Sequence, residues 1–147
     1  MAEETLNSAQ NQARENLIGA RLESVKRLDF DWGLRFGDGS SLMFQSLWRL
    51  VSDAVIEVTS EDDGQLFGLK NPVNAAEQLK LKIGEARITD VHIDDATSDL
   101  TFHFGQKLRL EIISTSAGYE AWSLHAKEIH IIGRNGDRAI FSTPKLP

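Results

Sequence analysis

The chain has no cysteine and only three prolines among its 147 residues. Without cysteine it has no disulfide bridge, thiol nucleophile or thiolate metal ligand. It also has no hydrophobic run of the roughly 18 residues that a membrane-spanning helix requires, so we expect no membrane partner. The first 16 residues lack the basic and apolar regions of a secretory signal. These absences predict a cytoplasmic location.

Basic residues are fewer than acidic residues in this chain. The chain has 16 Lys and Arg against 22 Asp and Glu, which gives a net charge of −6. Phosphate contacts need clustered basic residues, so we expect no direct nucleic-acid partner. Residues 50–69 contain an acidic patch and no basic residue; its members are Asp53, Glu57, Glu61, Asp62 and Asp63. Such a patch either steers a basic partner or simply keeps the surface solvated.

Alternation of polar and apolar residues is the dominant pattern in the sequence. Between Phe30 and Phe36 every second residue is large and apolar, which is typical of a half-buried antiparallel strand. Further strands are expected in SLMFQS, DAVIEVTS, ARITDVHID, DLTFHF, KLRLEIIS, YEAWSLHAKEIHII and AIFS. The pairs Asp38-Gly39 and Asn135-Gly136 suit tight hairpin turns.

Helical spacing occurs in one segment of the body of the chain. Apolar residues recur every three or four positions across residues 72–83, with Pro72 near the start and Gly84 at the end. Residues 1–16 form a polar N-terminal extension that is either a weak helix or disordered. The sequence therefore predicts an α+β fold, dominated by antiparallel β-sheet, in a single β-rich domain over residues 17–147.

The segments 17–70 and 83–132 resemble each other. Each contains an Arg-aliphatic pair, then a valine, then a Phe-Gly pair, and later a tryptophan, Trp48 or Trp122. The valine follows the aliphatic residue by three positions, an odd step that predicts a β-bulge in each segment. We therefore expect two similar four-stranded meanders joined by one helix. Chance similarity between two meanders is the alternative.

Motifs for catalysis or cofactor binding are lacking. The sequence has no Gly-rich phosphate loop and no G-x-S-x-G nucleophile elbow, and residues 61–68 lack the spacing of a calcium loop. Its four histidines include no His-x-x-x-His pair. His125 and His130 are five residues apart, so in one unbroken strand they would face opposite sides. We therefore expect no metal and no cofactor, and no motif in the sequence indicates an enzyme.

Aromatic residues suggest a contact surface. Tyr119 and Trp122 are three apart, so one is expected in the core and the other outside, while Trp48 lies at the end of a strand. On one interpretation all three are packing residues. On the other they line a shared groove, with Arg49 and Glu120 beside them as a binding hot spot.

Two further residues occupy matching places in the proposed repeat. Arg35 precedes the first Phe-Gly pair and His103 precedes the second. If a pocket lay between the two halves, these residues would be its candidate binding groups.

Three segments resemble a known family: GQLFGLKNPVNAA, DLTFHF together with LRLEII, and SAGYEAWSL. They are similar to a widespread family of small uncharacterised bacterial proteins, and the resemblance covers roughly residues 17–132. It implies a single cytoplasmic, β-rich domain, sometimes encoded among toxin and immunity genes. It assigns no functional residue, and the N-terminal extension lies outside it.

These observations favour a non-enzymatic protein-binding module. It would be immunity-like and would occlude a basic protein partner, such as a nuclease toxin, through its acidic patch. One alternative is a small-molecule-binding protein or enzyme with a pocket between the two halves. Another is a self-associating structural module, in which a homodimer covers exposed sheet edges.

Overall fold

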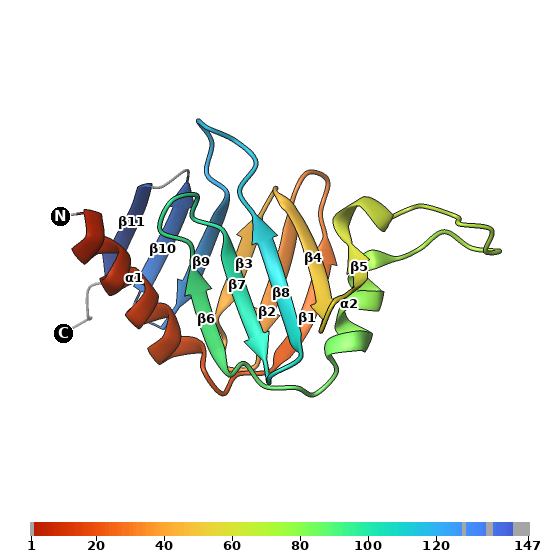
Figure 1. Ribbon diagram of the computed structural model, residues 1–147, viewed down its shortest axis with the longest axis horizontal. Helices are drawn as coiled ribbons and strands as arrows, with labels where there is room; N and C mark the ends of the chain where they lie inside the picture. The colour runs from red at the N-terminus through yellow and green to blue at the C-terminus, as the bar shows by residue number, and fades with distance from the viewer. Residues whose placement is uncertain (1, 128, 135–136, 143–147) are drawn as a thin grey trace.

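Figure 1 shows the chain as a computed structural model with two β-sheets and a helix at each end. The structure describes residues 2–127, 129–134 and 137–142, and the side-chain surroundings of residues 8–127 and 129–134. The helices are α1 (Ala2–Leu17) and α2 (Ala75–Ile83), with a short 3-10 helix, η1 (Ser60–Asp62). The strands are β1 (Leu22–Arg27), β2 (Trp32–Phe36), β3 (Ser41–Phe44), β4 (Leu47–Ser52), β5 (Val55–Thr59), β6 (Asp90–Ile93), β7 (Leu100–Phe104), β8 (Leu108–Ile113), β9 (Trp122–Ala126), β10 (Ile129–Arg134) and β11 (Asp137–Ser142).

Both sheets combine strands from the two halves of the chain. Sheet 1 has the order β1-β2-β3-β9-β10-β11, and sheet 2 has the order β5-β4-β8-β7-β6. All strand pairs are antiparallel. The predicted α+β class with mainly antiparallel sheet is therefore confirmed. The predicted grouping into two four-stranded meanders is not confirmed, because β3 pairs with β9 and β4 pairs with β8.

The core lies between the inner faces of the two sheets. Trp32 of sheet 1 meets Trp48 of sheet 2 edge-to-face, with ring centroids 5.1 Å apart, and Phe36 meets Phe102 at 5.6 Å. All four side chains are buried. Burying each such side chain contributes about 1.5–3 kcal/mol, so these inward positions hold the sheets together. The alternation predicted for residues 32–36 is the cause of this packing.

The two helices close the two sides of the sandwich. Helix α1 contacts β6 and β11, and helix α2 contacts β1 and β5. In α1 the buried residues Ala9, Ala13 and Leu17 recur every four positions and join the common core. The polar N-terminal extension is therefore helical and packs on the domain. Arg14 fixes it further by donating a hydrogen bond to the Asp90 carboxylate over 2.8 Å.

Helix α2 begins later than residue 72, where the sequence pattern predicts its start. Its N-cap is Asn74, whose side-chain oxygen accepts a hydrogen bond from the backbone N–H of Glu77 over 3.0 Å. Pro72 therefore lies in the preceding loop. Gly84 ends the helix with a φ of 58°, a left-handed conformation that favours glycine. Helix α2 is the shorter of the two α-helices, with 9 residues against 16 in α1.

Two apolar residues of the expected strands face solvent, although alternation places Phe30 on the same face as Trp32 and Ile56 on the same face as Val58. Phe30 is 81% exposed because β2 begins only at Trp32, after a turn closed by the Leu28 N–H donating to the Asp31 carbonyl over 2.8 Å. Ile56 is exposed because the register of β4 and β5 shifts between Leu50 and Val51. The predicted Asn135-Gly136 turn lies outside the described residues.

Candidate functional site

The predicted aromatic residues do not share one surface. Trp48 and Trp122 are both buried, whereas Tyr119 is 79% exposed. The indole N–H of Trp122 donates to the carbonyl of Ser98 over 2.7 Å, which anchors the ring in the core. Trp48 packs against Trp32, and its indole nitrogen has no hydrogen-bond partner among the described residues. Trp48 therefore does not reach the surface on which Tyr119 lies.

Tyr119, Glu120 and Trp122 do meet, at an open cavity of about 510 Å³ that we call the Tyr119 cavity. It is also lined by Asp31, Met43, Phe44, Gln45, Gly118, Ala121, Ser123 and Arg134. The hydroxyl oxygen of Ser116 holds the rim by accepting hydrogen bonds from the N–H groups of Gly118 and Tyr119, over 3.1 and 3.0 Å. Opposite charges meet here, so the cavity has no single electrostatic preference.

Arg35 and His103 lie on opposite outer faces of the sandwich. Arg35 is flanked in β2 by the buried residues Leu34 and Phe36, and His103 is flanked in β7 by Phe102 and Phe104. Successive side chains of a strand point to opposite faces, so both residues point away from the core. They form no common pocket, because core side chains fill the space between the sheets.

The prediction that His125 and His130 face opposite sides is wrong. The segment is two strands, and His125 of β9 is paired directly with His130 of β10. Their rings stack with centroids 3.8 Å apart. The Ser123 hydroxyl lies 2.6 Å from Nε2 of His130. Burial and the neighbouring His125 both lower the pKa of His130, against the opposing effect of Glu120.

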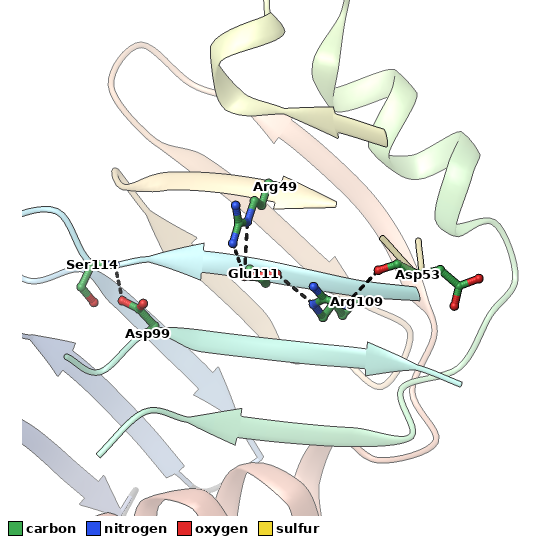
Figure 2. Close-up of polar contacts among 6 residues, drawn as sticks. All are labelled: Arg49, Asp53, Asp99, Arg109, Glu111 and Ser114. Carbon is green, nitrogen blue, oxygen red and sulfur yellow. Dashed lines mark hydrogen bonds and ion pairs between the residues drawn. The ribbon is translucent and has the colours of Figure 1, made fainter. Parts of the chain in front are cut away.

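Arg49 is held in an ion-pair network on the outer face of sheet 2 (Figure 2). Its guanidinium lies 3.1 Å from one Glu111 carboxylate oxygen, and Arg109 lies 2.9 Å from the other. Arg109 also donates to the backbone carbonyl of Asp53 over 3.4 Å, while Asp99 accepts from the Ser114 N–H at the far end of the sheet. Arg49 therefore serves first to link β4 to β8.

The pKa of Glu111 is lowered by this network. Burial alone raises the pKa, but the hydrogen bonds and charges of Arg109 and Arg49 outweigh it and hold the pKa below 4.5, the ordinary value. A carboxyl group whose pKa is lower in the folded state stabilises that state at pH values above the unfolded-state pKa. This stabilisation is lost as the pH falls through the folded-state pKa.

We expect the stability difference between the wild type and Glu111→Gln to be largest near neutral pH. It should begin to shrink as the pH falls below about 4.5, where the unfolded chain binds a proton first, and should be lost below the lowered folded-state pKa, where Glu111 is neutral in both states. Urea unfolding at a series of pH values from 7 to 3 measures the difference. Glu85→Gln is the control, because Glu85 pairs with Arg21 in a mostly exposed ion pair. A difference for Glu111→Gln that is constant with pH would contradict this account.

The acidic patch is spread along β5 and the loop after it. Asp53 lies in the turn before β5, and Glu57 within β5 faces Lys82 of α2 at 3.5 Å. Asp62 accepts a hydrogen bond from the Thr59 N–H, and Asp63 accepts one from the Ala75 N–H. A backbone N–H carries no net charge, so these two carboxylates still make this side of the molecule acidic.

A projecting loop beside this patch is the feature that sequence analysis missed. The yellow-green loop between η1 and α2 extends away from both sheets (Figure 1). We call residues 64–73 the finger. Its base is closed like a hairpin, because the Gly64 N–H donates to the Val73 carbonyl and the Val73 N–H donates to the Gln65 carbonyl, each over 2.8 Å. The finger therefore has a defined backbone.

The tip of the finger exposes three large apolar side chains. Leu66 is 52% exposed, Phe67 67% and Leu69 60%. The Leu69 N–H donates to the Leu66 carbonyl over 2.7 Å, and both residues between them have positive φ, 47° at Phe67 and 78° at Gly68. This pattern matches a type I′ turn, in which Asn and Gly are the preferred residues. A phenylalanine there is strained by about 1–2 kcal/mol.

A groove separates the finger from the body of the molecule. Its volume is about 740 Å³, and β5, α2 and the finger all contribute to it. Apolar lining comes from Val58, Phe67, Leu69, Pro72 and Val73, and charged lining from Glu57, Asp62, Lys70, Glu77 and Lys82. The apolar tip is thus bordered by polar groups, a composition typical of protein contact surfaces.

Among the described residues no group of three or more His, Asp or Glu side chains is arranged to hold a metal ion. Over the same residues, no helix is long and apolar enough to cross a bilayer. Comparison with models of protein families, with curated proteins and with solved structures finds no match to the chain.

Proposed function

We propose that the chain is a non-enzymatic protein-binding module, immunity-like, that docks a basic protein partner through the finger and the acidic patch beside it and so occludes it. One observation carries the proposal: Phe67 is two-thirds exposed and held in a left-handed backbone conformation. Strained backbone tends to persist where function requires it, and clustered exposed apolar residues mark interaction sites. Phe67 does not belong to the buried core of the described residues.

The charge near the finger supports a basic partner. Residues 53–78 contain six acidic residues (Asp53, Glu57, Glu61, Asp62, Asp63 and Glu77) and one basic residue, Lys70. A positively charged partner would be attracted to this surface before contact. A second copy of the chain would bring like charges together, which disfavours a homodimer through the finger. The acidic surface therefore supports a basic partner of a different sequence.

We also propose that segments 17–70 and 83–132 are related units. Strands β1-β2-β3 and then β4-β5 follow α1, as β6-β7-β8 and then β9-β10 follow α2, and each unit changes sheet after its third strand. Arg21 and Arg87, at matching positions, form a β-bridge with each other. The finger lies in the connection between β5 and α2, outside the strands of both units. Connections of this length are commonly functional.

Site-specific photo-crosslinking tests the proposed surface. A photo-reactive phenylalanine analogue would replace Leu66 or Leu69 on the finger, or Tyr119 at the cavity. It would also replace Gln106, an exposed residue in the turn between β7 and β8, as the control. We expect positions 66 and 69 to capture the same basic protein, and positions 106 and 119 to capture none of it.

The captured protein would then be purified and its dissociation constant measured at low and high salt. We expect binding to weaken as salt screens the acidic patch. Capture of this partner from position 119 alone would move the contact to the Tyr119 cavity. Capture from position 106 as readily as from position 66 would show that the finger is not the binding surface.

A further inference from the structure

The inner strands of sheet 1, β2, β3, β9 and β10, carry cationic and hydroxyl side chains on their outer face. On these four strands the outward positions, set by alternation with buried residues, are Gly33, Arg35, Ser41, Met43, Ser123, His125, His130, Ile132 and Arg134. None of them is Asp or Glu, although acidic residues outnumber basic ones by 22 to 16 in the chain. These four strands therefore differ in charge from the chain as a whole, and the nearby carboxylates lie outside them, at Glu23 in β1 and at Asp31 and Glu120 beside the Tyr119 cavity.

Hydrogen-bond donors form a continuous row across this face. The register places Arg35 beside Ser41, Ser41 beside His125, and His125 beside His130. Side chains at directly opposite positions have Cβ atoms about 4.5–5.5 Å apart. An anion lying over Ser41 is thus within reach of both Arg35 and His125. Arg35 makes no ion pair with a carboxylate in the described part of the chain.

We propose that this row is a binding site for a phosphate group, held by the Arg35 guanidinium, the Ser41 hydroxyl and the His125 imidazole. A guanidinium donates two parallel hydrogen bonds that match two oxygens of one phosphate. A serine hydroxyl and an imidazole N–H supply further donors from the neighbouring strands. The stacked ring of His130, itself bonded to Ser123, keeps His125 in place beside Ser41.

The outer face of sheet 2 provides a matched comparison within the same molecule. It also pairs an arginine with a histidine, because Arg109 lies directly beside His103. However, Arg109 is ion-paired with Glu111, and Asp90 lies on the other side of His103. These carboxylates neutralise or repel an approaching anion, so the cationic groups of sheet 2 are not expected to bind phosphate.

NMR titration of the full-length ¹⁵N-labelled protein tests the site. Three ligands would be compared at constant ionic strength: pyrophosphate, a short phosphoserine peptide, and the same peptide without phosphate. We expect saturable shifts of the Arg35, Ser41 and His125 amides with one or both phosphorylated ligands, and none with the unphosphorylated peptide. Shifts with pyrophosphate alone would identify a site for free phosphates. Shifts with the phosphopeptide alone would identify a site for phosphorylated proteins.

Two variants make the test specific. Arg35→Gln should weaken binding at least 10-fold, whereas Arg109→Gln on the opposite face should leave it unchanged. The proposal is overturned if neither phosphorylated ligand gives saturable shifts, if the shifts spread equally over both sheets, or if Arg35→Gln binds like the wild type. The finger lies on a different surface of the molecule. The outcome of this titration therefore does not affect the outcome expected from the crosslinking experiment.

Discussion

Replacing Gly133 by alanine is expected to lower the free energy of unfolding by about 3 kcal/mol, the upper part of the range for overpacking a core. Gly133 is a buried position in β10, paired with Trp122 in β9. A Cβ atom at Gly133 would overlap the indole ring of Trp122. The ring cannot move aside easily, because it is buried and its N–H is bonded to the Ser98 carbonyl. Urea denaturation of the purified variant measures the loss.

Two further variants separate overpacking from other effects of adding a methyl group. Gly37→Ala is the control, because its nearest neighbour would be the Arg21 carbonyl oxygen at 3.8 Å, an ordinary contact. Adding Trp122→Leu to Gly133→Ala should cost less than the two single losses combined, because the smaller side chain relieves the overlap. Wild-type stability for Gly133→Ala would show that the ring does not lie against the Gly133 backbone.

Phe67→Asn is expected to separate stability from binding. Asparagine tolerates the positive φ of this turn position, so the free energy of unfolding should be unchanged or rise by up to about 1 kcal/mol. Affinity for the crosslinked partner should fall by about 30-fold or more, corresponding to a hot-spot loss of about 2 kcal/mol. Urea denaturation and titration calorimetry measure the two quantities on the same preparation.

Tyr119→Asn is the matched control for this variant. Tyr119 is at least as exposed as Phe67 and also lies on a loop, at the rim of the other cavity. If loss of any exposed aromatic side chain weakened binding non-specifically, the two variants would behave alike. We expect Tyr119→Asn to bind the partner with wild-type affinity.

The local alternation of the sequence was enough to predict most strands and the inward face of β2. Trp32, Leu34 and Phe36 are all buried as expected. The same pattern failed at Phe30, because the turn between Leu28 and Asp31 decides where the strand starts. Strand ends depend on backbone hydrogen bonds that side-chain periodicity does not encode.

Strand order could not be read from the same pattern. The pairing of β3 with β9 joins residues about 80 positions apart, and alternation says only which face of a strand is buried. The hairpin between His125 and His130 was missed for a related reason. The residues between these strands include no Gly, Asn or Pro to mark a turn, so the sequence pattern predicts one strand.

The candidate sites were predictable only in part. The sequence singled out Tyr119, Glu120 and Trp122, and the structure places these three at one cavity. It also located the acidic patch, but not the finger beside it. The letters LFGL are apolar and resemble a buried segment, and only the positive φ of Phe67 and the hydrogen-bonded base of the finger place them in solvent.

In the proposed complex, the strained and exposed Phe67 on the finger contacts the partner. The most direct measurement is the dissociation constant of the crosslinked partner for Phe67→Asn, compared with the wild type and Tyr119→Asn under identical salt conditions. We expect a loss of about 30-fold for Phe67→Asn alone, in a protein at least as stable as the wild type. Unchanged affinity for Phe67→Asn, with the variant folded, would contradict this expectation.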